Sequence, residues 1–382
     1  MSGIKTVITA CDMVTAYGIG SQYCWDGLLS SKSAISKMER FSTASLQTRN
    51  AATVPGLKYL EESSLVMQMF SALLKRDKVF IPSDALLFLA TTTGEIDILE
   101  KKILEGAADA KERTLGFLLE KVRTLTEIKG EGSIISSACA SSSAALGFAS
   151  SLIQSGKHDC VLVVAADAVT EFVFSGFSSL MALDPDTAKP FDKNRAGLSL
   201  GEAAGFILLM SENRARNENR KISGEVAGWA VAGDANHMTG PSRDGNGLKL
   251  AIQKALQNAG VSSDDVGCIS SHGTGTVYND SMEMKAYKSV FENRTVPLYS
   301  IKGAVGHTMG AAGLIETVIA LRVLEERIIP PTVGLIDVDP EAKDWASLEK
   351  RRLEKDVVLL NNSGFGGVNA ALVLRQQEKE MW

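Results

Sequence analysis

The strongest constraint on the fold is an alternation, along most of the 382 residues, of strand-like and helix-like runs. The strand-like runs cover residues 6–9, 85–91, 161–166, 204–210, 226–231, 267–271 and 357–361. The helix-like runs cover residues 64–76, 94–104, 114–125, 142–153, 247–259, 281–291 and 311–326. This alternation predicts an α/β protein in which helices are layered on largely buried sheets. No short repeat is visible, so solenoids and propellers are not expected.

A polar, charged stretch marks the expected internal boundary. It covers residues 211–221, reads SENRARNENRK and separates two strand-like runs. Polar segments of this kind connect compact units at the protein surface. We therefore expect two parts of similar length, residues 1–212 and residues 213–382.

Composition and charge exclude several classes of protein. Hydrophobic residues make up 45% and charged residues 22%, as in ordinary globular domains. The net charge is −5 and no long basic run occurs, so no nucleic-acid partner is expected. The five cysteines form no CxxC pair, which argues against a disulfide framework and for a reducing compartment. With no signal peptide recognisable, we expect a cytoplasmic protein.

One uncharged stretch could be mistaken for a membrane helix. Residues 132–156 carry no charge and are numerous enough to span a bilayer, but nine of them are serines. Such polarity is improbable in a membrane helix. The stretch predicts instead a helix buried inside protein, with small side chains that allow close packing, and no membrane insertion.

The same stretch contains the first chemical signal, Cys139. A short apolar strand over residues 133–135 precedes the cysteine, and a helix rich in small residues follows it. A strand-to-helix turn places the thiol at the positive end of the helix dipole, which favours a thiolate. From this segment alone, a nucleophile and a buried structural cysteine are both open.

Two of the four histidines lie in glycine-rich segments at strand ends. His272 opens HGTGTVYND, in which Thr274 and Thr276 offer hydroxyls, and His307 lies in KGAVGHTMGAAGLIE. Each histidine alone fits a structural role. A third glycine-rich loop over residues 361–369 suggests that such loops surround a shared site. His237, in another loop, has no assigned role, and His158 is expected at the surface.

A zinc site built from Cys139, His272 and His307 is the alternative chemistry. However, none of these residues lies in an HxxxH or CxxC pair, which are the usual local metal-binding spacings. No metal is therefore expected.

Six motifs, in order, resemble those of the elongating 3-oxoacyl-[acyl-carrier-protein] synthases, the beta-ketoacyl synthases of the thiolase-like superfamily. They are SACASS, PFDKNRAGLSLGEAAG, DANHMTGP, HGTGTVYND, KGAVGHTMGAAGLIE and NSGFGGVN. The resemblance implies a thiolase fold, in which two similar βαβαβαββ halves form five α-β-α-β-α layers.

The resemblance also implies roles for individual residues. Cys139 would accept the acyl group, His272 and His307 would drive decarboxylation, and Lys302 would support His307. Phe365 would act as the gate, and its backbone N–H would join that of Cys139 in an oxyanion hole. The remaining residues have supporting or substrate-binding roles: Glu316 and Asp280 support the site, and Thr274, Thr276 and Ser363 line the substrate path.

The implied activity is that of an acyltransferase. It performs a decarboxylative Claisen condensation of an acyl-cysteine with malonyl-acyl carrier protein, in fatty-acid or polyketide biosynthesis. No cofactor is implied, because phosphopantetheine of the carrier protein holds the substrates. The expected partners are acyl carrier protein and a second ketosynthase-like chain, in a homodimer or a heterodimer. The alternative is a non-elongating subunit that shapes the pocket of an active partner.

Related families fit less well. Thiolases use a second cysteine near the C-terminus, but no cysteine follows Cys268. Initiating synthases combine cysteine, histidine and asparagine, whereas His307 occupies the position of the second base here. A non-catalytic partner would lack the nucleophile, and Cys139 is present.

The chain also departs from the family pattern. The region between Thr91 and Cys139 is shorter than expected, so the chain-length preference cannot be transferred. Ser363 stands where many relatives carry phenylalanine, and Ala203 replaces a glycine. We therefore expect a ketosynthase of specialised metabolism that accepts an unusual or polyunsaturated acyl chain.

Overall fold

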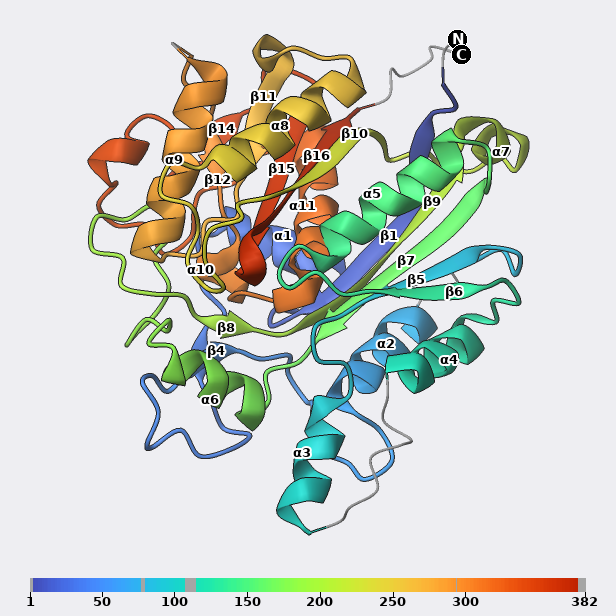
Figure 1. The fold of residues 1–382 in the computed structure, drawn as a ribbon. Coiled ribbons are helices and arrows are strands. Elements are labelled where there is room, and N and C mark those ends of the chain that lie inside the picture. The colour runs from blue at the N-terminus through green and yellow to red at the C-terminus, as the bar shows by residue number, and fades with distance from the viewer. Residues whose placement is uncertain (1–2, 77–79, 107–114, 293, 377–382) are drawn as a thin grey trace.

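A mixed β-sheet organises the computed structural model, which describes residues 3–76, 80–106, 115–292 and 294–376. Within these ranges the sheet has 11 strands in the order β12-β11-β15-β16-β10-β1-β9-β7-β5-β6, with β2 paired to β1. Strands β1 and β10 are joined through only two residue pairs, Val7 with Glu225 and Ile8 with Gly224. The sheet therefore consists of two wings that meet at one narrow seam (Figure 1).

The two wings have the same strand order. The first wing contains β1 (Thr6–Thr15), β9 (Ala203–Ser211), β7 (Cys160–Asp167), β5 (Leu86–Ala90) and β6 (Gly132–Ile135). The second contains β10 (Gly224–Gly233), β16 (Val368–Arg375), β15 (Val357–Gly364), β11 (Val266–Ser270) and β12 (Leu298–Tyr299). In each wing, the strands rank first, fifth, fourth, second and third along the chain. The last three strands of each series run parallel.

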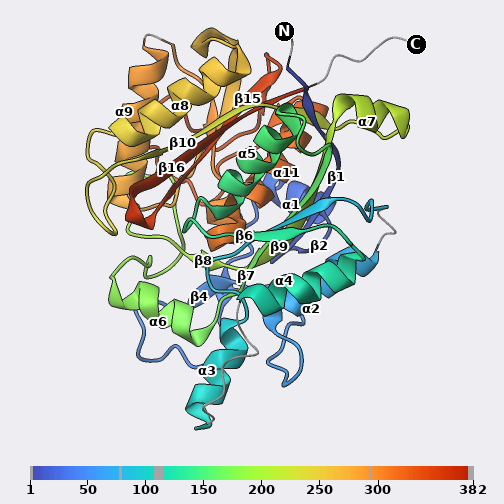
Figure 2. The same ribbon diagram turned by 45° about the vertical axis from the view of Figure 1, so that its right-hand side comes forward.

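Two helices fill the space between the wings. They are α5 (Ser141–Gln154) and α11 (Ala312–Glu326), and both contact strands of both wings. The outer face of the first wing is covered by α2 (Leu65–Arg76) and α4 (Leu115–Thr126), and that of the second by α8 (Asn246–Ala259) and α9 (Val277–Phe291). Figures 1 and 2 show the resulting α-β-α-β-α layers. The predicted thiolase-type α/β architecture is thereby confirmed.

The remaining elements are short. The helices are α1 (Ser21–Leu29), α3 (Ile96–Leu104), α6 (Glu171–Ser179), α7 (Glu212–Asn217) and α10 (Lys302–Val305), with 3-10 turns η2 (Ser263–Asp265), η3 (Met309–Ala311), η4 (Pro340–Ala342) and η5 (Phe365–Gly367). The strands are β2 (Gly18–Ile19), β3 (Ser36–Lys37), β4 (Asn50–Ala52), β8 (Leu200–Gly201), β13 (Ile328–Ile329) and β14 (Arg351–Arg352).

The expected helix within residues 132–156 is α5, and it is buried as predicted. Its serines 141–143 and 150 are inaccessible to solvent. Small residues are required at the crossings, because a Cβ at Gly147 would lie 2.2 Å from the Trp229 ring. In the described part of the chain, no helix combines the length and apolarity needed to cross a bilayer.

Some elements differ from the expected ones. Strand β1 extends six residues beyond the predicted residues 6–9 and continues past a register shift between Ile8 and Ala10 in its pairing with β9. Asp12 accepts a hydrogen bond from the backbone N–H of Ser21 at 2.6 Å. Helices α1 and α6 and strand β16 were not predicted. Residue 114, the start of one predicted helix, lies outside the described residues.

The predicted boundary after residue 212 falls at the start of α7, in the connection between the two wings. The division into residues 1–212 and 213–382 stays a prediction.

Candidate active site

The turn that carries Cys139 connects the end of β6 to the start of α5. Ala138, just before the cysteine, has a φ of +48°, a left-handed conformation that is uncommon for a residue with a Cβ. The Ser141 hydroxyl stabilises the turn by accepting from the Ser137 N–H at 2.8 Å and donating to the Ala138 carbonyl at 2.6 Å. Gly364 packs on this turn, because a Cβ there would lie 3.1 Å from the Cys139 nitrogen. The turn thereby holds the thiol next to the loop that contains Phe365.

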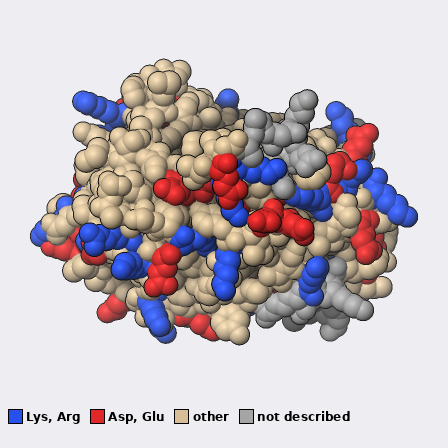
Figure 3. Space-filling model, turned by 90° about the horizontal axis from the view of Figure 1, so that it is seen from below, with Lys and Arg blue, Asp and Glu red and all other residues tan. Residues whose placement is uncertain are grey.

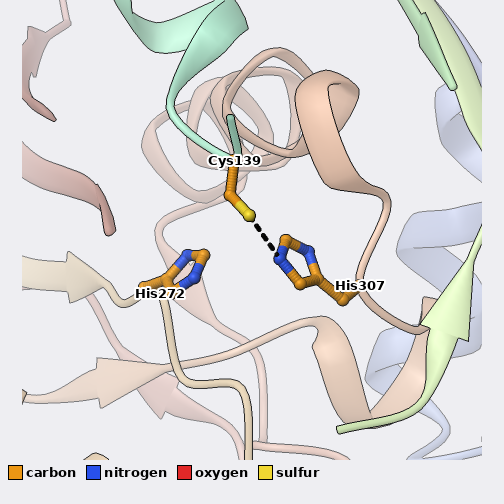
Figure 4. Close-up of side chains that lie close together, drawn as sticks. All are labelled: Cys139, His272 and His307. Atoms are coloured by element: carbon orange, nitrogen blue, oxygen red, sulfur yellow. Dashed lines mark hydrogen bonds between the residues drawn. The ribbon is translucent and has the colours of Figure 1, made fainter. Parts of the chain in front are cut away.

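The structure brings together three side chains that are far apart in the sequence. The Sγ atom of Cys139 lies 3.0 Å from Nε2 of His307. The ring centroids of His272 and His307 are 5.2 Å apart, and the rings meet edge to face at an interplanar angle of 86°. All three side chains are buried. Figure 4 shows both imidazoles beside the sulfur, so these residues form one site.

Hydrogen bonds to the Nδ1 atoms determine which imidazole nitrogen carries the proton. The backbone N–H of Met309 lies 3.3 Å from Nδ1 of His307 and can only donate, so this Nδ1 is an acceptor. Burial, followed by the positive charge of Lys302, holds the pKa of His307 well below its usual range. The neutral ring therefore carries its proton on Nε2, which points to the sulfur.

Burial and Lys302 likewise hold the pKa of His272 well below its usual range, and His307 contributes further. Both histidines are therefore neutral. This state suits groups that donate a hydrogen bond without giving up a proton.

The thiol of Cys139 has an unexpected pKa. The turn at the start of α5 predicts a lowered value, but burial raises the pKa to about 11. Lys302 and the backbone N–H groups of Phe365 and Cys139 oppose this rise. The prediction of a lowered thiol pKa is therefore wrong, because the loss of solvation outweighs the effects of Lys302 and of these N–H groups.

Lys302 and Glu316 form a buried ion pair behind the imidazoles. The second carboxylate oxygen of Glu316 accepts from Nδ2 of Asn362 at 2.6 Å. The charge of Lys302 acts on both histidines and on the cysteine, whereas the sequence assigned it to His307 alone.

Two carboxylates hold the loop that begins at His272. Glu283 accepts from the backbone N–H of His272 at 2.8 Å and of Gly273 at 2.7 Å. Asp280 accepts from the backbone N–H of Phe191 at 2.8 Å and of Gly275 at 3.2 Å. Burial, followed by the charge of Glu283, raises the pKa of Asp280 to about 7. Asp280 thus holds the loop in place, and its supporting role in the reaction stays a prediction. The part played by Glu283 was not predicted.

Asp167, at the end of β7, holds the loop that follows His307. It accepts from the backbone N–H of Gly310 at 2.7 Å, from that of Thr92 at 3.0 Å and from the Thr91 hydroxyl at 2.8 Å. Sequence reasoning missed this residue. The available signal was an aspartate directly after the strongly apolar run 161–166.

A cavity of about 420 Å³ opens onto the three side chains. On its wall, the hydroxyls of Thr274 and Thr276 lie 3.0 Å apart. The Phe365 ring stacks on Phe177 of α6, with centroids 5.7 Å apart. The cavity thus joins an aromatic, apolar wall to a polar one. That combination suits a chain carrying both apolar and amide groups.

The two other histidines lie apart from the cysteine. His237 is exposed at the rim of the cavity, where its Nδ1 accepts from the backbone N–H of Gly240 at 3.1 Å. His158 is exposed, as expected, and does not line this cavity.

The zinc alternative can be compared with this geometry. The ligand atoms of Cys139, His272 and His307 lie within 4.8 Å of one another, so their spacing could accommodate a metal ion. A metal-binding imidazole nitrogen must be free of its proton, whereas Nε2 of His307 carries one. The nearby positive charge of Lys302 also opposes a cation. The arrangement therefore fits acid–base and acyl chemistry better than metal binding.

Comparison with known protein families shows what this chain is similar to. Residues 121–215 match the N-terminal domain of beta-ketoacyl synthases, and residues 223–335 match the C-terminal domain. This chain belongs to the beta-ketoacyl synthase family.

Individual relatives cover most or all of this ketosynthase. It is 29% identical over 415 aligned residues to "3-oxoacyl-[acyl-carrier-protein] synthase 2" of Vibrio cholerae, covering 98% of this chain and 100% of the relative. It is 35% identical over 260 residues to "Putative polyketide beta-ketoacyl synthase 1" of Streptomyces virginiae, covering 66% and 62%. The solved ishigamide ketosynthase/chain length factor superposes with a TM-score of 0.90 at 27% identity, covering 99% and 100%.

Ser363, one of the two positions that depart from the family pattern, lines the cavity. The Ser363 hydroxyl donates to Oδ1 of Asn369 at 2.7 Å, and Asn369 in turn donates to Asp234 at 2.8 Å. The Ser363 hydroxyl is therefore already engaged on the cavity wall. Ala203 is fully buried at the start of β9.

Proposed function

We propose that this chain is a beta-ketoacyl-[acyl-carrier-protein] synthase that elongates a cysteine-bound acyl group by decarboxylative Claisen condensation. The observation that carries the proposal is the 3.0 Å contact between Cys139 Sγ and His307 Nε2, with His272 beside them in one cavity. Two findings support the proposal: the chain belongs to the beta-ketoacyl synthase family, and these three side chains share one cavity.

In the first step, Cys139 takes the acyl group from a carrier-protein thioester. The cysteine sulfur attacks the thioester carbonyl, the bond to the pantetheine sulfur breaks, and the thiol proton passes to that leaving sulfur. Because the pKa of Cys139 is about 11, the thiolate forms as the acyl donor binds and not in the resting protein. The Nε2–H of His307 points at the sulfur and would stabilise its charge.

In the second step, malonyl carrier protein loses carbon dioxide. The bond between the carboxylate carbon and the α-carbon breaks, and its electron pair moves towards the thioester oxygen as an enolate. Two imidazole N–H groups directed at that oxygen would stabilise it, and one such donor is typically worth about 3 kcal/mol. His272 and His307 are neutral, and their rings are close enough to act together.

In the third step, the α-carbon attacks the acyl carbonyl on Cys139. A carbon–carbon bond forms, the carbon–sulfur bond breaks, and the cysteine leaves as a thiolate. The thiolate then takes a proton from solvent, which restores the resting thiol. The oxygen of the tetrahedral intermediate would accept from the backbone N–H groups of Cys139 and Phe365, the same two groups that oppose the rise in the thiol pKa.

The substrates would be carried on phosphopantetheine of acyl carrier protein, with no further cofactor. From the cavity wall, the hydroxyls of Thr274 and Thr276 would form hydrogen bonds with the amides of that arm, both as donors and as acceptors. A cytoplasmic location and pairing with a second ketosynthase-like chain, in a homodimer or a heterodimer, belong to the same proposal. On the face in Figure 3, acidic and basic side chains are interspersed, which gives no support to a nucleic-acid partner.

The alternative is a pocket-shaping subunit of a ketosynthase heterodimer. The solved ketosynthase/chain length factor is a precedent for such a pairing. The Cys139, His272, His307 and Lys302 arrangement favours the active half, because an idle subunit needs no nucleophile. We further propose specialised metabolism with an unusual acyl chain. Equal loading of ordinary saturated primers would contradict that proposal.

The deciding experiment is intact-mass analysis after incubation with acyl carrier protein. The unmodified protein should gain one acyl group, and Cys139→Ala should gain none while still decarboxylating malonyl carrier protein. His272→Ala should retain acylation and lose at least about 100-fold of its decarboxylation, as expected for a lost oxyanion donor. Acylation of Cys139→Ala would refute the nucleophile. One bound zinc in the native mass would favour the metal site.

A further inference from the structure

We propose that Asn362 is a positioning residue that holds His272 in the Nε2–H tautomer. The hydrogen bonds around Asn362 are present in the structure whichever reaction the protein catalyses. The catalytic consequence rests on the proposed condensing activity.

Asn362 lies on β15 and is fully buried. Its Nδ2 donates to Oε2 of Glu316 at 2.6 Å and lies 3.4 Å from Nδ1 of His272. Its Oδ1 accepts from the Ser143 hydroxyl of α5. One amide thereby connects α11, α5 and the loop after β11.

The orientation of the amide follows from its neighbours. Glu316 is paired with Lys302, so its carboxylate only accepts hydrogen bonds, and the NH₂ end of Asn362 must face it. The NH₂ group has two hydrogens. One is used by Glu316, and the other faces Nδ1 of His272. Because an amide NH₂ can only donate, Nδ1 must be the acceptor in this contact.

This contact determines what His272 offers to a substrate. In a neutral imidazole, an accepting Nδ1 leaves the proton on Nε2. Nε2–H can donate to an enolate oxygen, whereas a bare Nε2 would repel it. Glu283 holds the backbone of His272, and across the described ranges Asn362 makes the one hydrogen bond found to its ring. Lys302, Glu316 and Asn362 thus form a chain that ends at the imidazole.

An isosteric change tests this assignment. In Asn362→Asp, an oxygen replaces Nδ2 and carries at most one proton. If that proton is present, it is donated to the adjacent Glu316 carboxylate. That oxygen then faces His272 as an acceptor and draws the imidazole proton to Nδ1. We expect decarboxylation to fall about 100-fold, while Cys139 acylation stays within about threefold, because the cysteine–His307 contact is untouched.

The direct readout is the ¹⁵N NMR spectrum of histidine-labelled protein, which contains only four histidines. The unaltered protein should show His272 with a protonated Nε2, and Asn362→Asp should show the proton on Nδ1. The control is Asn258→Asp, the same chemical change on α8, where the amide donates to the Trp229 carbonyl at 2.9 Å. It should alter neither the tautomer nor the decarboxylation.

Two results would overturn the assignment: a protonated Nδ1 on His272 in the unaltered protein, or an unchanged tautomer in Asn362→Asp. The first needs no variant, so a poorly folding variant cannot hide it. If the tautomer behaves as expected but the unaltered protein does not decarboxylate malonyl carrier protein, Asn362 keeps its positioning role and the proposed function fails.

Discussion

At the scale of single residues, burial has the largest effect on the pKa of the Cys139 thiol. Cys139 stands at the start of a helix, beside a lysine and two backbone N–H groups, and its pKa is nevertheless raised to about 11. In this buried site, the loss of solvation destabilises the thiolate more than the lysine and the N–H groups stabilise it. The resting group is therefore the neutral thiol, which is less easily oxidised than a thiolate. It becomes reactive when a bound substrate stabilises the thiolate.

This pKa predicts how alkylation depends on pH. Because the thiolate is the reacting species, the iodoacetamide rate at Cys139 should rise about tenfold per pH unit between about pH 7 and 10. No bend is expected near the usual histidine pKa, because both imidazoles stay neutral. The rate is measured by mass spectrometry, with Cys139→Ala as the background. A plateau below about pH 9 would contradict the raised pKa.

At the scale of elements, the central helices depend on small residues. Gly147 of α5 packs against the ring of Trp229, and Gly313 of α11 packs against Ser143 of α5. The close approach lets α5 bring Cys139 to the cavity while α11 brings Glu316 behind the imidazoles. Larger residues would separate the layers that carry the two halves of the site.

Gly147→Ala should therefore destabilise the fold. The added methyl would lie 2.2 Å from the Trp229 ring, and overpacking of this kind costs about 1–3 kcal/mol. The matched control is Gly176→Ala in α6, where no atom lies within 4 Å of the new Cβ. It should be neutral or stabilising by up to about 1 kcal/mol. Denaturant unfolding compares the two, and equal stabilities would contradict the packing argument.

At the scale of the whole molecule, the site lies between the two wings. Cys139 follows a strand of the first wing, whereas both histidines follow strands of the second. Asp167 binds Gly310 across this divide. The central core contains residues of both wings packed around α5 and α11. The first wing therefore covers part of α11, and the second wing covers part of α5.

This shared core predicts that the halves do not fold alone. Residues 1–212 and 213–382, expressed separately, should each lack a cooperative thermal transition, because α5 or α11 would expose a large apolar surface. Circular dichroism and NMR dispersion measure this, with the full chain as the control. A cooperative transition in either half would show that it is an independent domain.

How far the site could be predicted differs between residues. Cys139, His272, His307 and Lys302 stand in local motifs, so their meeting was predictable once the motifs were seen together. Glu283, Asp167 and Asn362 were not predicted. The partners of Asp167 lie up to 143 positions away, and those of Asn362 up to 219. No local pattern announces such contacts.

The amino-acid order by itself determined the alternation of strands and helices, the buried small-residue helix and the candidate residues for the chemistry. These depend on periodicity and on local turns, which extend over a few residues. Only the tertiary structure decided the raised pKa of Cys139, the neutral imidazoles and their proton positions. Those properties depend on solvent exclusion and on hydrogen bonds between distant segments, and both arise only when the two wings close around the central helices.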